Sequence, residues 1–257
     1  MTTTTHVPTT NGPMNALVFT DPLPYAPVAE LQERLVAARC ADAIPDTILF
    51  LEHQPVITIG VRGKESHILQ SHAALQARGI AVEKTVRGGD VTYHAPGQLV
   101  MYPILNLDFA RMDVHGYIAG IEETAIATAR HFGIEPFRRK GMTGVWTAQG
   151  KLAAIGVRFK HRVAYHGLSF NVNIDLTGFA TIVPCGLAGE PVASMQSLLG
   201  ARCPRIDEVR QIMTREFGRI FGRSLTIYVS PSNFPQAYHH VGVESVADKN
   251  TGNPPAH

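Results

Sequence analysis

The chain has 257 residues, of which 45% are hydrophobic and 17% charged, so it can bury one substantial core. Its formal net charge of +2 is too small to argue for nucleic-acid binding, and no basic amphipathic stretch indicates binding to a membrane surface. The longest apolar runs, such as residues 99–107, are far shorter than the roughly 20 residues that a membrane span needs. We therefore expect a globular protein with no nucleic-acid or membrane partner.

The two ends of the chain differ in composition from its middle. Residues 1–13 are rich in threonine and lack a cationic region followed by an apolar stretch, so they predict a disordered leader rather than a secretory signal. Residues 14–246 are expected to fold as a single domain, and residues 247–257, rich in Asn, Gly and Pro, as a flexible tail. The three cysteines, Cys40, Cys185 and Cys203, indicate neither a disulfide framework nor a zinc knuckle, which favours a reducing cytoplasm.

The first half of the chain predicts helices and strands in irregular order. Apolar residues at helical spacing behind Pro27 predict a helix, and Cys40, near its end, is expected in the core. Residues 48–60 predict two extended pieces interrupted at Gln54-Pro55, because proline removes a ladder donor. A short helix over 71–78 should stop at Gly79. Two further strands are expected, over 80–86 and 98–107, with a loop beginning at Arg87 between them.

The second half predicts a helix over 113–132 that ends at Gly133, and then a hairpin over 143–160 whose turn holds Lys151 at its tip or just inside. Residues 168–174 alternate between apolar and polar, which predicts a half-buried strand in a sheet with one solvated face. A strand-like run over 179–183 follows. An amphipathic helix over 209–220 and a strand over 225–229 complete the series. The fold class is therefore α+β, with a mixed, largely antiparallel sheet and flanking helices.

Pro184-Cys185-Gly186-Leu187 is the strongest local signal for chemistry. A cysteine between proline and glycine sits on a fixed turn that can present its sulfur, although most free cysteines are small buried hydrophobes. The thiolate is the nucleophile, and a neighbouring cation favours it over the thiol. Lys151 is the best candidate for that cation, but it could equally be a solvated turn lysine. His94 and His166 are the alternative bases, or else structural residues.

The other informative segments carry glycines and small residues. Arg87-Gly88-Gly89 can bring backbone amides close to a ligand or form a tight turn, and it matches no nucleotide-binding pattern. Ala153, Ala154 and Gly156 leave room on a sheet for an alkyl chain, or for a packed helix. No ligand spacing is found among the twelve histidines, so we expect no metal site.

Read together, these segments resemble the lipoyl(octanoyl) transferase family, the octanoyl-[acyl-carrier-protein]:protein N-octanoyltransferases. The similarity covers about residues 51–199, and any one landmark is weak while the ordered series is specific. The landmarks are Leu51 to Gly60, Arg87 to Gln98, Gly150-Lys151-Leu152-Ala153-Ala154-Ile155-Gly156, His166 to Asn171, and Pro184-Cys185-Gly186. The resemblance implies a fold shared with the catalytic domains of biotin and lipoate protein ligases, so the 14–246 domain is expected to be catalytic.

The family resemblance also implies an activity. An octanoyl group would pass from octanoyl-acyl carrier protein to a lysine of a lipoyl domain, through a thioester on Cys185, with Lys151 lowering the cysteine pKa and relaying protons. Expected acceptors are lipoyl domains of 2-oxoacid dehydrogenase complexes and the glycine cleavage H protein. No cofactor is expected, because the acyl group arrives on the phosphopantetheine arm of the carrier. The implied substrate-binding residues are Arg87, Gly88, Gly89, Asp90, Val91, Thr92, Tyr93, His94, Ala154, Ile155, Gly156, Gly167, Leu168 and Ser169.

Some questions stay open at this stage. Asp90, Ala95 and Ser169 depart from the usual family residues, and Asp90 raises the question of charge in the pocket. Because acyl carrier proteins are acidic, we expect a basic docking surface at Arg138-Arg139-Lys140 and at Arg158, Lys160 and Arg162, unless these are simply solvated charges. The alternatives to a transferase are an ATP-dependent lipoate or biotin ligase on the same fold, a non-catalytic module that holds acylated carriers, and a cysteine hydrolase.

Overall fold

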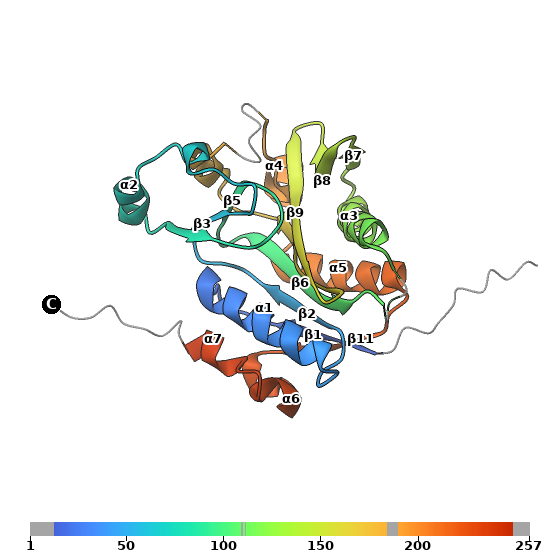
Figure 1. The fold of residues 1–257 in the computed structure, drawn as a ribbon. Coiled ribbons are helices and arrows are strands. Elements are labelled where there is room, and N and C mark those ends of the chain that lie inside the picture. Colours follow the sequence, from blue (N-terminus) through green and yellow to red (C-terminus); the bar gives the residue numbers. More distant parts are fainter. Residues whose placement is uncertain (1–12, 109, 111, 184–189, 249–257) are drawn as a thin grey trace, which may run out of the picture.

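An eight-stranded sheet forms the centre of the molecule in the computed structural model, which describes residues 13–108, 110, 112–183 and 190–248 (Figure 1). Its strand order is β11-β1-β2-β6-β10-β9-β8-β7. The pairs β1–β2 and β1–β11 are parallel and the others antiparallel. This confirms the predicted α+β class with a mixed, largely antiparallel sheet. The strands are β1 (Met14–Val18), β2 (Thr47–Leu51), β6 (Gln98–Asn106), β7 (Phe137–Arg139), β8 (Met142–Thr147), β9 (Gly150–Lys160), β10 (Val163–Asn171) and β11 (Leu225–Val229).

A second, three-stranded sheet lies beside the first, in the order β4-β3-β5. Its strands are β3 (Val56–Ile59), β4 (Ala81–Lys84) and β5 (Val91–His94). The sequence predicted β3 and β4 but placed residues 91–94 in a loop. β5 is too short and too polar to show a pattern of its own, and it is a strand because all four of its residues pair with β3. Strand propensity is decided by the neighbouring strand as much as by the residues themselves.

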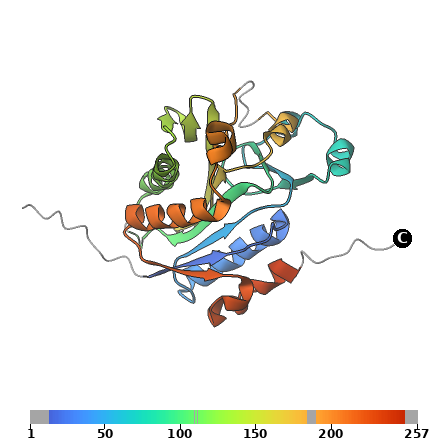
Figure 2. The same ribbon diagram turned by 180° about the vertical axis from the view of Figure 1, so that it is seen from behind.

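Helices cover both faces of the large sheet. On one face α3 (Val114–His131) and α5 (Ile206–Phe221) pack on Ile48 and Phe50 of β2. On the other, α1 (Tyr25–Cys40) packs on Leu49 and Leu51 of the same strand. Figure 1 shows α1 in front of the sheet, and Figure 2 shows α5 across its back. Consecutive residues of a strand point to opposite faces of the sheet, so β2 packs against helices on both sides. Each fully buried aliphatic or aromatic side chain contributes roughly 1.5–3 kcal/mol to stability.

The prediction of a solvated sheet face was wrong. The alternation over residues 168–174 is present, with Leu168 and Phe170 in the core beneath α3 and α5. However, all nine residues of β10 are buried, including Ser169 and Asn171 on its polar side. α1 packs against β10 and β6, and the small sheet lies beside that face. Small polar side chains on a buried sheet face indicate a site or a hydrogen-bond network as readily as contact with water.

Helix ends follow the sequence signals closely. The Ser71 hydroxyl accepts from Ala74 N–H at the start of α2 (His72–Ala77), and the Asp113 carboxylate accepts from Gly116 N–H at the start of α3. Gly79, at φ +69°, and Gly133, at φ +78°, follow the ends of these helices. The remaining elements are η1 (Glu65–His67), η2 (Leu176–Thr181), α4 (Met195–Leu199), η4 (Gly200–Arg202), η5 (Pro231–Asn233), α6 (Gln236–His239) and α7 (Glu244–Asp248).

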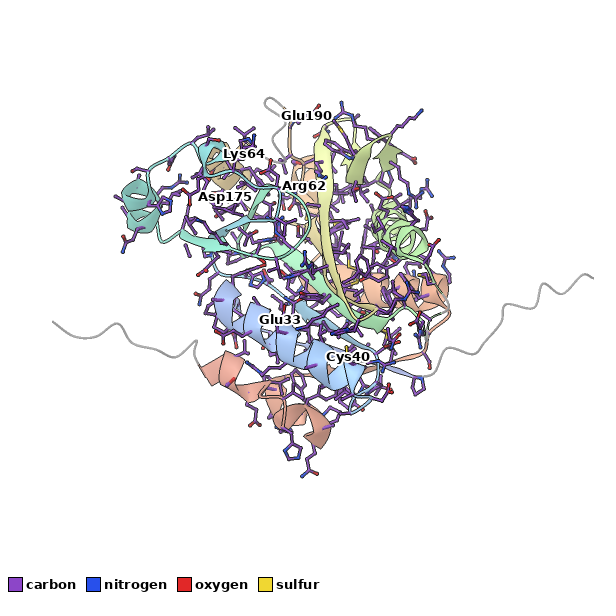
Figure 3. All side chains as sticks on the ribbon, viewed as in Figure 1. Glu33, Cys40, Arg62, Lys64, Asp175 and Glu190 are labelled. Atoms are coloured by element: carbon purple, nitrogen blue, oxygen red, sulfur yellow. The ribbon has the colours of Figure 1, made fainter. Side chains whose placement is uncertain are left out.

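Two local predictions were wrong. Cys40 is exposed at the last turn of α1, because the buried stripe of that helix ends with Arg39, whose guanidinium bonds the buried Asp46 (Figure 3). The strand-like run over 179–183 begins inside η2, because the Asp175 carboxylate accepts from Thr177 N–H and starts a 3₁₀ turn there. Only Ile182 forms a β-bridge, with Ile68.

The predicted leader and tail lie outside the described residues, except for Pro13 and for 247–248 at the end of α7. The single-domain boundary therefore stays a prediction. Over the described ranges, no helix combines the length and the apolar character that crossing a bilayer requires.

Candidate active site

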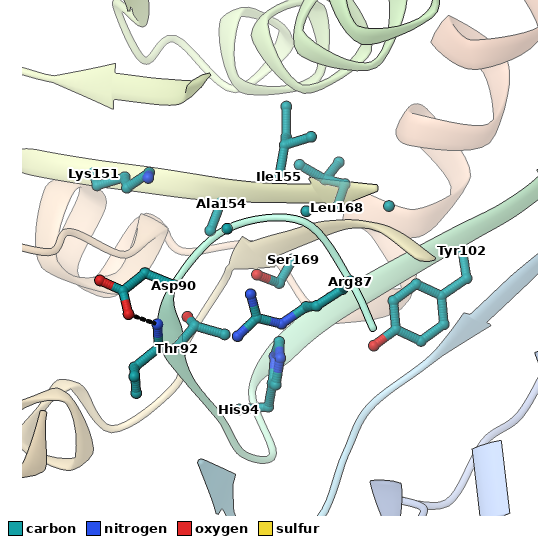
Figure 4. Close-up of a pocket in the computed structure, with 14 residues that line it drawn as sticks. Arg87, Asp90, Thr92, His94, Tyr102, Lys151, Ala154, Ile155, Leu168 and Ser169 are labelled. Carbon is teal, nitrogen blue, oxygen red and sulfur yellow. Dashed lines mark hydrogen bonds between the residues drawn. The ribbon is translucent and has the colours of Figure 1, made fainter. Parts of the chain in front are cut away.

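An open pocket lies between β6, β10 and β9 of the large sheet and β5 of the small sheet, with about 460 Å³ of unfilled space, part of it open to solvent. Figure 4 shows its labelled residues, with Lys151 and Asp90 towards one end and Tyr102 towards the other. The size suits a small organic ligand. The residues that line it are Arg87, Gly89, Asp90, Val91, Thr92, His94, Tyr102, Lys151, Ala154, Ile155, Gly156, Gly167, Leu168 and Ser169.

The structure thus brings together twelve of the fourteen implied substrate-binding residues with Lys151, all of them lining the pocket. The other two, Gly88 and Tyr93, lie outside the pocket lining. Gly88 packs against β9, and its N–H donates to Val157 O of that strand at 3.0 Å. Tyr93 points to the opposite side of β5, with its ring against Gly178 and 5.5 Å from the ring of Phe179. Four short segments far apart in the sequence therefore form one cavity.

Close approach of the Arg87–Asp90 loop to β9 depends on glycine. A Cβ at Gly156 would lie 2.7 Å from Gly88 O, closer than real Cβ contacts allow. Gly89 adopts φ +93°, a conformation that only glycine reaches without strain. The loop therefore rests directly on β9, and three of its residues, Arg87, Gly89 and Asp90, line the pocket.

The Arg87 side chain is buried at the root of this loop. Its Nε and Nη2 donate to Thr58 Oγ1 at 3.0 and 2.8 Å, and Nη2 also donates to Thr58 O at 2.6 Å. Its Nη1 donates to Gly88 O at 3.0 Å. Hydrogen bonds from a charged donor are among the stronger ones in proteins, so Arg87 fixes the loop to β3. Its charge also lies at the pocket wall.

His94 is held by a chain of hydrogen bonds that begins at a backbone carbonyl. Ala193 O accepts from Asn171 Nδ2, and Asn171 Oδ1 accepts from Gln98 Nε2 at 2.8 Å. Gln98 Oε1 then accepts from His94 Nδ1 at 2.6 Å. Because a carbonyl can only accept, the direction of every later bond is set, and His94 keeps its proton on Nδ1. Its Nε2 is left as an acceptor, 3.5 Å from Thr58 Oγ1.

Three buried histidines lie close together: His94 lines the pocket, and His53 and His166 lie behind it. Burial lowers the pKa of His53 to about 4 and that of His166 to about 3, and it holds the pKa of His94 well below its usual value. All three are therefore neutral at pH 7. A histidine with so low a pKa is a poor proton acceptor, which argues against His94 and His166 as the catalytic base. Lys151 is left as the strongest candidate.

Lys151 lies just inside the β8–β9 hairpin, as predicted. Its Nζ is 5.1 Å from the ring centroid of Trp146, within the range of a cation–π contact. A Cβ at Gly144 would lie 2.7 Å from Lys151 Cε, so the glycine leaves the space that the lysine side chain fills. A second, mostly apolar hollow of about 300 Å³ shares Thr92, Lys151, Ala154 and Ser169 with the pocket, and its other lining residues are Gln98, Asn171, Phe179 and Val192. Lys151 thus lies where two hollows meet.

Cys185 lies outside the described residues, but the chain on either side of it is described. After it, Lys151 N–H donates to Pro191 O at 2.9 Å, and Ala193 N–H donates to Lys151 O at 3.0 Å. A Cβ at Gly150 would lie 2.5 Å from Pro191 O, so the glycine before Lys151 permits this approach. Before it, Val183 N–H donates to His67 O at 2.8 Å. Both flanks of the cysteine segment are therefore bonded to residues at the pocket or beside it.

The carboxylate of Asp90, which raised the question of charge in the pocket, is held by its neighbours. It accepts from Val91 N–H at 2.8 Å, the bond drawn in Figure 4, and lies 2.8 Å from Nδ1 of His67. The carboxylate therefore has hydrogen-bonding partners on the pocket loop and on η1. Within the described ranges, no group of three His, Cys, Asp or Glu side chains is arranged to hold a metal ion.

Sequence reasoning missed Tyr102, Thr58 and His53 at this site. Tyr102 closes one end of the pocket, and its hydroxyl lies 3.0 Å from His53 Nε2. His53 Nδ1 lies 3.1 Å from Leu23 O, so it donates there, and Nε2 accepts from Tyr102. A tyrosine inside the apolar run 99–107 was the available signal, since a buried tyrosine needs a partner for its hydroxyl.

The predicted docking cations are exposed, but most already have partners. Arg138 pairs with Glu122 and Glu123, Arg139 with Glu190, Lys160 with Glu33, and Arg162 with Asp108, at 2.6–3.2 Å. Lys140 and Arg158 form no ion pair with any carboxylate that the structure describes.

Comparison with solved structures defines the class of fold. A lipoate-protein ligase A bound with ATP superposes with a TM-score of 0.68 at 16% identity, covering 94% of this chain and 96% of that one. A bi-partite lipoate protein ligase from Thermoplasma acidophilum gives 0.66 at 16% identity, covering 91% and 92%. At these identities the likeness shows the fold alone, which is the one that the sequence resemblance implied.

Sequence comparison identifies the family. The family model described as "Lipoyl protein ligase A/B catalytic domain" matches residues 24–218, and the chain belongs to this family. An octanoyltransferase from Pelobacter propionicus is 47% identical over 194 residues, covering 75% of this chain and 88% of the relative. One from Chloroflexus aurantiacus is 44% identical over 200 residues, covering 77% and 89%. The chain is accordingly an acyltransferase.

Proposed function

We propose that the chain transfers an octanoyl group from octanoyl-acyl carrier protein to a specific lysine of lipoyl domains, through a thioester on Cys185. One observation carries this proposal. Lys151 lies at the end of a ligand-sized pocket, and the chain that follows Cys185 is hydrogen-bonded to the backbone of Lys151 itself. The named activity of relatives at 44–47% identity supports the choice of acyl group.

The covalent path of the chain supports Cys185 as the nucleophile. Val183, bonded to His67, precedes Cys185 by two positions, and two residues of extended chain span at most about 7 Å. His67 in turn contacts Asp90, which lines the pocket. An ammonium group beside a cysteine stabilises the thiolate, and each tenfold gain in thiolate corresponds to about 1.4 kcal/mol.

The reaction proceeds in two acyl transfers. In the first, the Cys185 thiolate attacks the donor thioester carbonyl, the bond to the phosphopantetheine sulfur breaks, and Lys151 protonates the departing thiolate. In the second, the acceptor lysine amine attacks the enzyme thioester, the bond to Cys185 breaks, and the amine proton passes to neutral Lys151. The first step exchanges one thioester for another and the second forms a more stable amide. The chemistry therefore needs no ATP and no cofactor.

The pocket supplies binding energy for the acyl tail. Six methylenes at about 0.8 kcal/mol each give roughly 5 kcal/mol when fully buried. One methylene more or less changes binding by only about 1–3 kcal/mol, so chain-length selection should be graded. The proposed acceptors are lipoyl domains of 2-oxoacid dehydrogenase complexes and the glycine cleavage H protein, and the proposed compartment is the cytoplasm.

Intact-mass analysis after mixing with octanoyl-carrier donor tests the proposal. We expect a gain of one octanoyl unit that maps to Cys185, is labile to hydroxylamine, and passes to a lipoyl domain without ATP. Cys185→Ala should load no octanoyl group, and Lys151→Gln should load at least about a hundredfold more slowly, because one general acid–base group contributes roughly 10²–10⁴-fold. Full transfer by Cys185→Ala would contradict the proposal.

The same assay separates the three alternatives. A ligase would require ATP and free acid, and would be indifferent to the loss of Cys185. A non-catalytic carrier-binding module would bind acylated carriers equally well with alanine at that position, and would show no turnover. A cysteine hydrolase would load the cysteine but release free octanoate faster than it modifies a lipoyl domain.

A further inference from the structure

The short segment 65–69 joins two parts of the molecule that the proposed reaction must keep aligned. On one side it runs beside the chain that leads to Cys185: Leu69 N–H donates to Thr181 O at 2.8 Å, and Ile68 bridges Ile182. Ile68 and Ile182 also pack in the same apolar cluster. On its other side lies the Arg87–Asp90 loop that covers the pocket.

His67 bonds to both sides at once. Its backbone oxygen accepts from Val183 N–H at 2.8 Å, and its imidazole Nδ1 lies 2.8 Å from the Asp90 carboxylate. The two side chains are 24% and 12% exposed, so water only partly competes for the contact. Hydrogen bonds to an ionised group contribute more than neutral ones, particularly where solvent is partly excluded.

Asp90 is itself fixed in place. Its other contacts are to backbone: Val91 N–H donates to its side chain, and Gly60 N–H donates to its carbonyl oxygen at 3.1 Å. The next residue back, Gly89, accepts from Arg62 N–H through its carbonyl oxygen at 3.0 Å. The carboxylate is therefore an anchor on the pocket loop, and the imidazole reaches it from the segment that borders the cysteine's flank.

We propose that His67 and Asp90 form a positioning pair that couples the loop covering the pocket to residues 181–183, the chain that leads to Cys185, so that bound acyl group and cysteine stay in register. The inference rests on the proposed function, because it needs Cys185 as the reacting group. Misplacement of reacting groups by about 1 Å can slow a reaction roughly a hundredfold, so a link of this kind acts on rate more than on donor binding.

A double-mutant cycle tests the pair. Single-turnover loading of octanoyl onto Cys185 is measured for wild type, His67→Ala, Asp90→Ala and the double variant, together with the donor KM and the melting temperature. We expect each single variant to load about tenfold more slowly with its KM within about twofold, and the double variant to lose no more than either single one. His67→Asn, whose amide can still donate to Asp90, should recover most of the rate.

A matched control lies on the same turn. Glu65 pairs with Lys84 at 3.0 Å, but both side chains are largely exposed, so Glu65→Gln removes an ion pair from η1 without touching His67. It should load at the wild-type rate. The pair is overturned if His67→Ala loads normally, if the single losses multiply to about a hundredfold, if asparagine gives no recovery, or if Glu65→Gln is equally slow. Wild type that loads no octanoyl at all would overturn the proposed function as well.

Discussion

Acidification should destabilise this protein through the three buried histidines. His53, His94 and His166 have a lowered pKa in the folded state because burial disfavours the charged ring. In the unfolded chain each returns to about 6.5. The unfolded state therefore binds more protons below pH 6.5, and stability rises with pH in that range. The stabilisation is fully present above about pH 6.5 and is lost as pH falls towards about 4.

The size of the effect follows from the unfolded state alone. At pH 5.5 the ratio of protonated to neutral histidine in the unfolded chain is about ten to one. Each such histidine therefore stabilises the unfolded chain by RT ln 11, or about 1.4 kcal/mol. The folded rings stay neutral there, since burial gives His53 a pKa of about 4 and His166 one of about 3. Three such rings make the protein about 4 kcal/mol less stable at pH 5.5 than at pH 7.5. This is a large part of the 5–15 kcal/mol typical of a domain.

Urea unfolding at the two pH values measures this loss, and Trp146, the single tryptophan and 3% exposed, reports it by fluorescence. The matched variant is His166→Phe. Neither ring nitrogen of His166 finds a partner within the described part of the chain, so phenylalanine removes the titration without removing a hydrogen bond. His166 adopts φ +55°, which a phenylalanine tolerates less well, but this strain is equal at both pH values and cancels from the difference.

We expect the variant's loss between pH 7.5 and 5.5 to fall from about 4 to about 3 kcal/mol, since one of three titrating rings is gone. Glu52 acts in the opposite sense, because burial raises its pKa and its folded form is protonated more readily on acidification. It is unchanged in the variant and does not affect the comparison. Equal pH dependence in wild type and variant would show that His166 is not held neutral by the fold, and the reasoning would fail.

Two further predictions concern the pocket and the donor. Gly156→Ala places a Cβ 2.7 Å from Gly88 O, so it should lift the covering loop and slow octanoyl loading at least about tenfold in the single-turnover assay. The control is Gly79→Ala, where φ is +69° and the added Cβ would have no atom within 4 Å. This variant should lose about 1 kcal/mol of stability and load octanoyl at the wild-type rate. If the two alanine variants loaded equally slowly, the pocket explanation would be refuted. Reversing the charge at Lys140 and Arg158 should weaken the salt dependence of kcat/KM for octanoyl-acyl carrier protein without changing kcat/KM for octanoyl-pantetheine. A salt-independent reaction of the wild type would rule out the docking surface.

Local signals in the sequence determined the longer helices and most of the strands. Helical spacing and the glycines that follow α2 and α3 predicted these helices correctly, and the structure shows that they are capped by Ser71 and Asp113. The hairpin was found because its turn chemistry is local. The fold class followed from the irregular order of strands and helices, and an ordered series of short motifs carried the family. Each of these features depends on residues that are neighbours along the chain.

Only the tertiary structure decided which of those residues meet. β5 is a strand because β3 pairs with it, and β10 is buried on both faces because α1 and the small sheet together cover the side that the sequence marked as solvated. The approach of residues 191–193 to Lys151, the joining of His67 to Asp90, and the low pKa values of the buried histidines all follow from packing between distant segments. A sequence records which side chains are present, whereas burial and distance depend on how the whole chain folds around each of them.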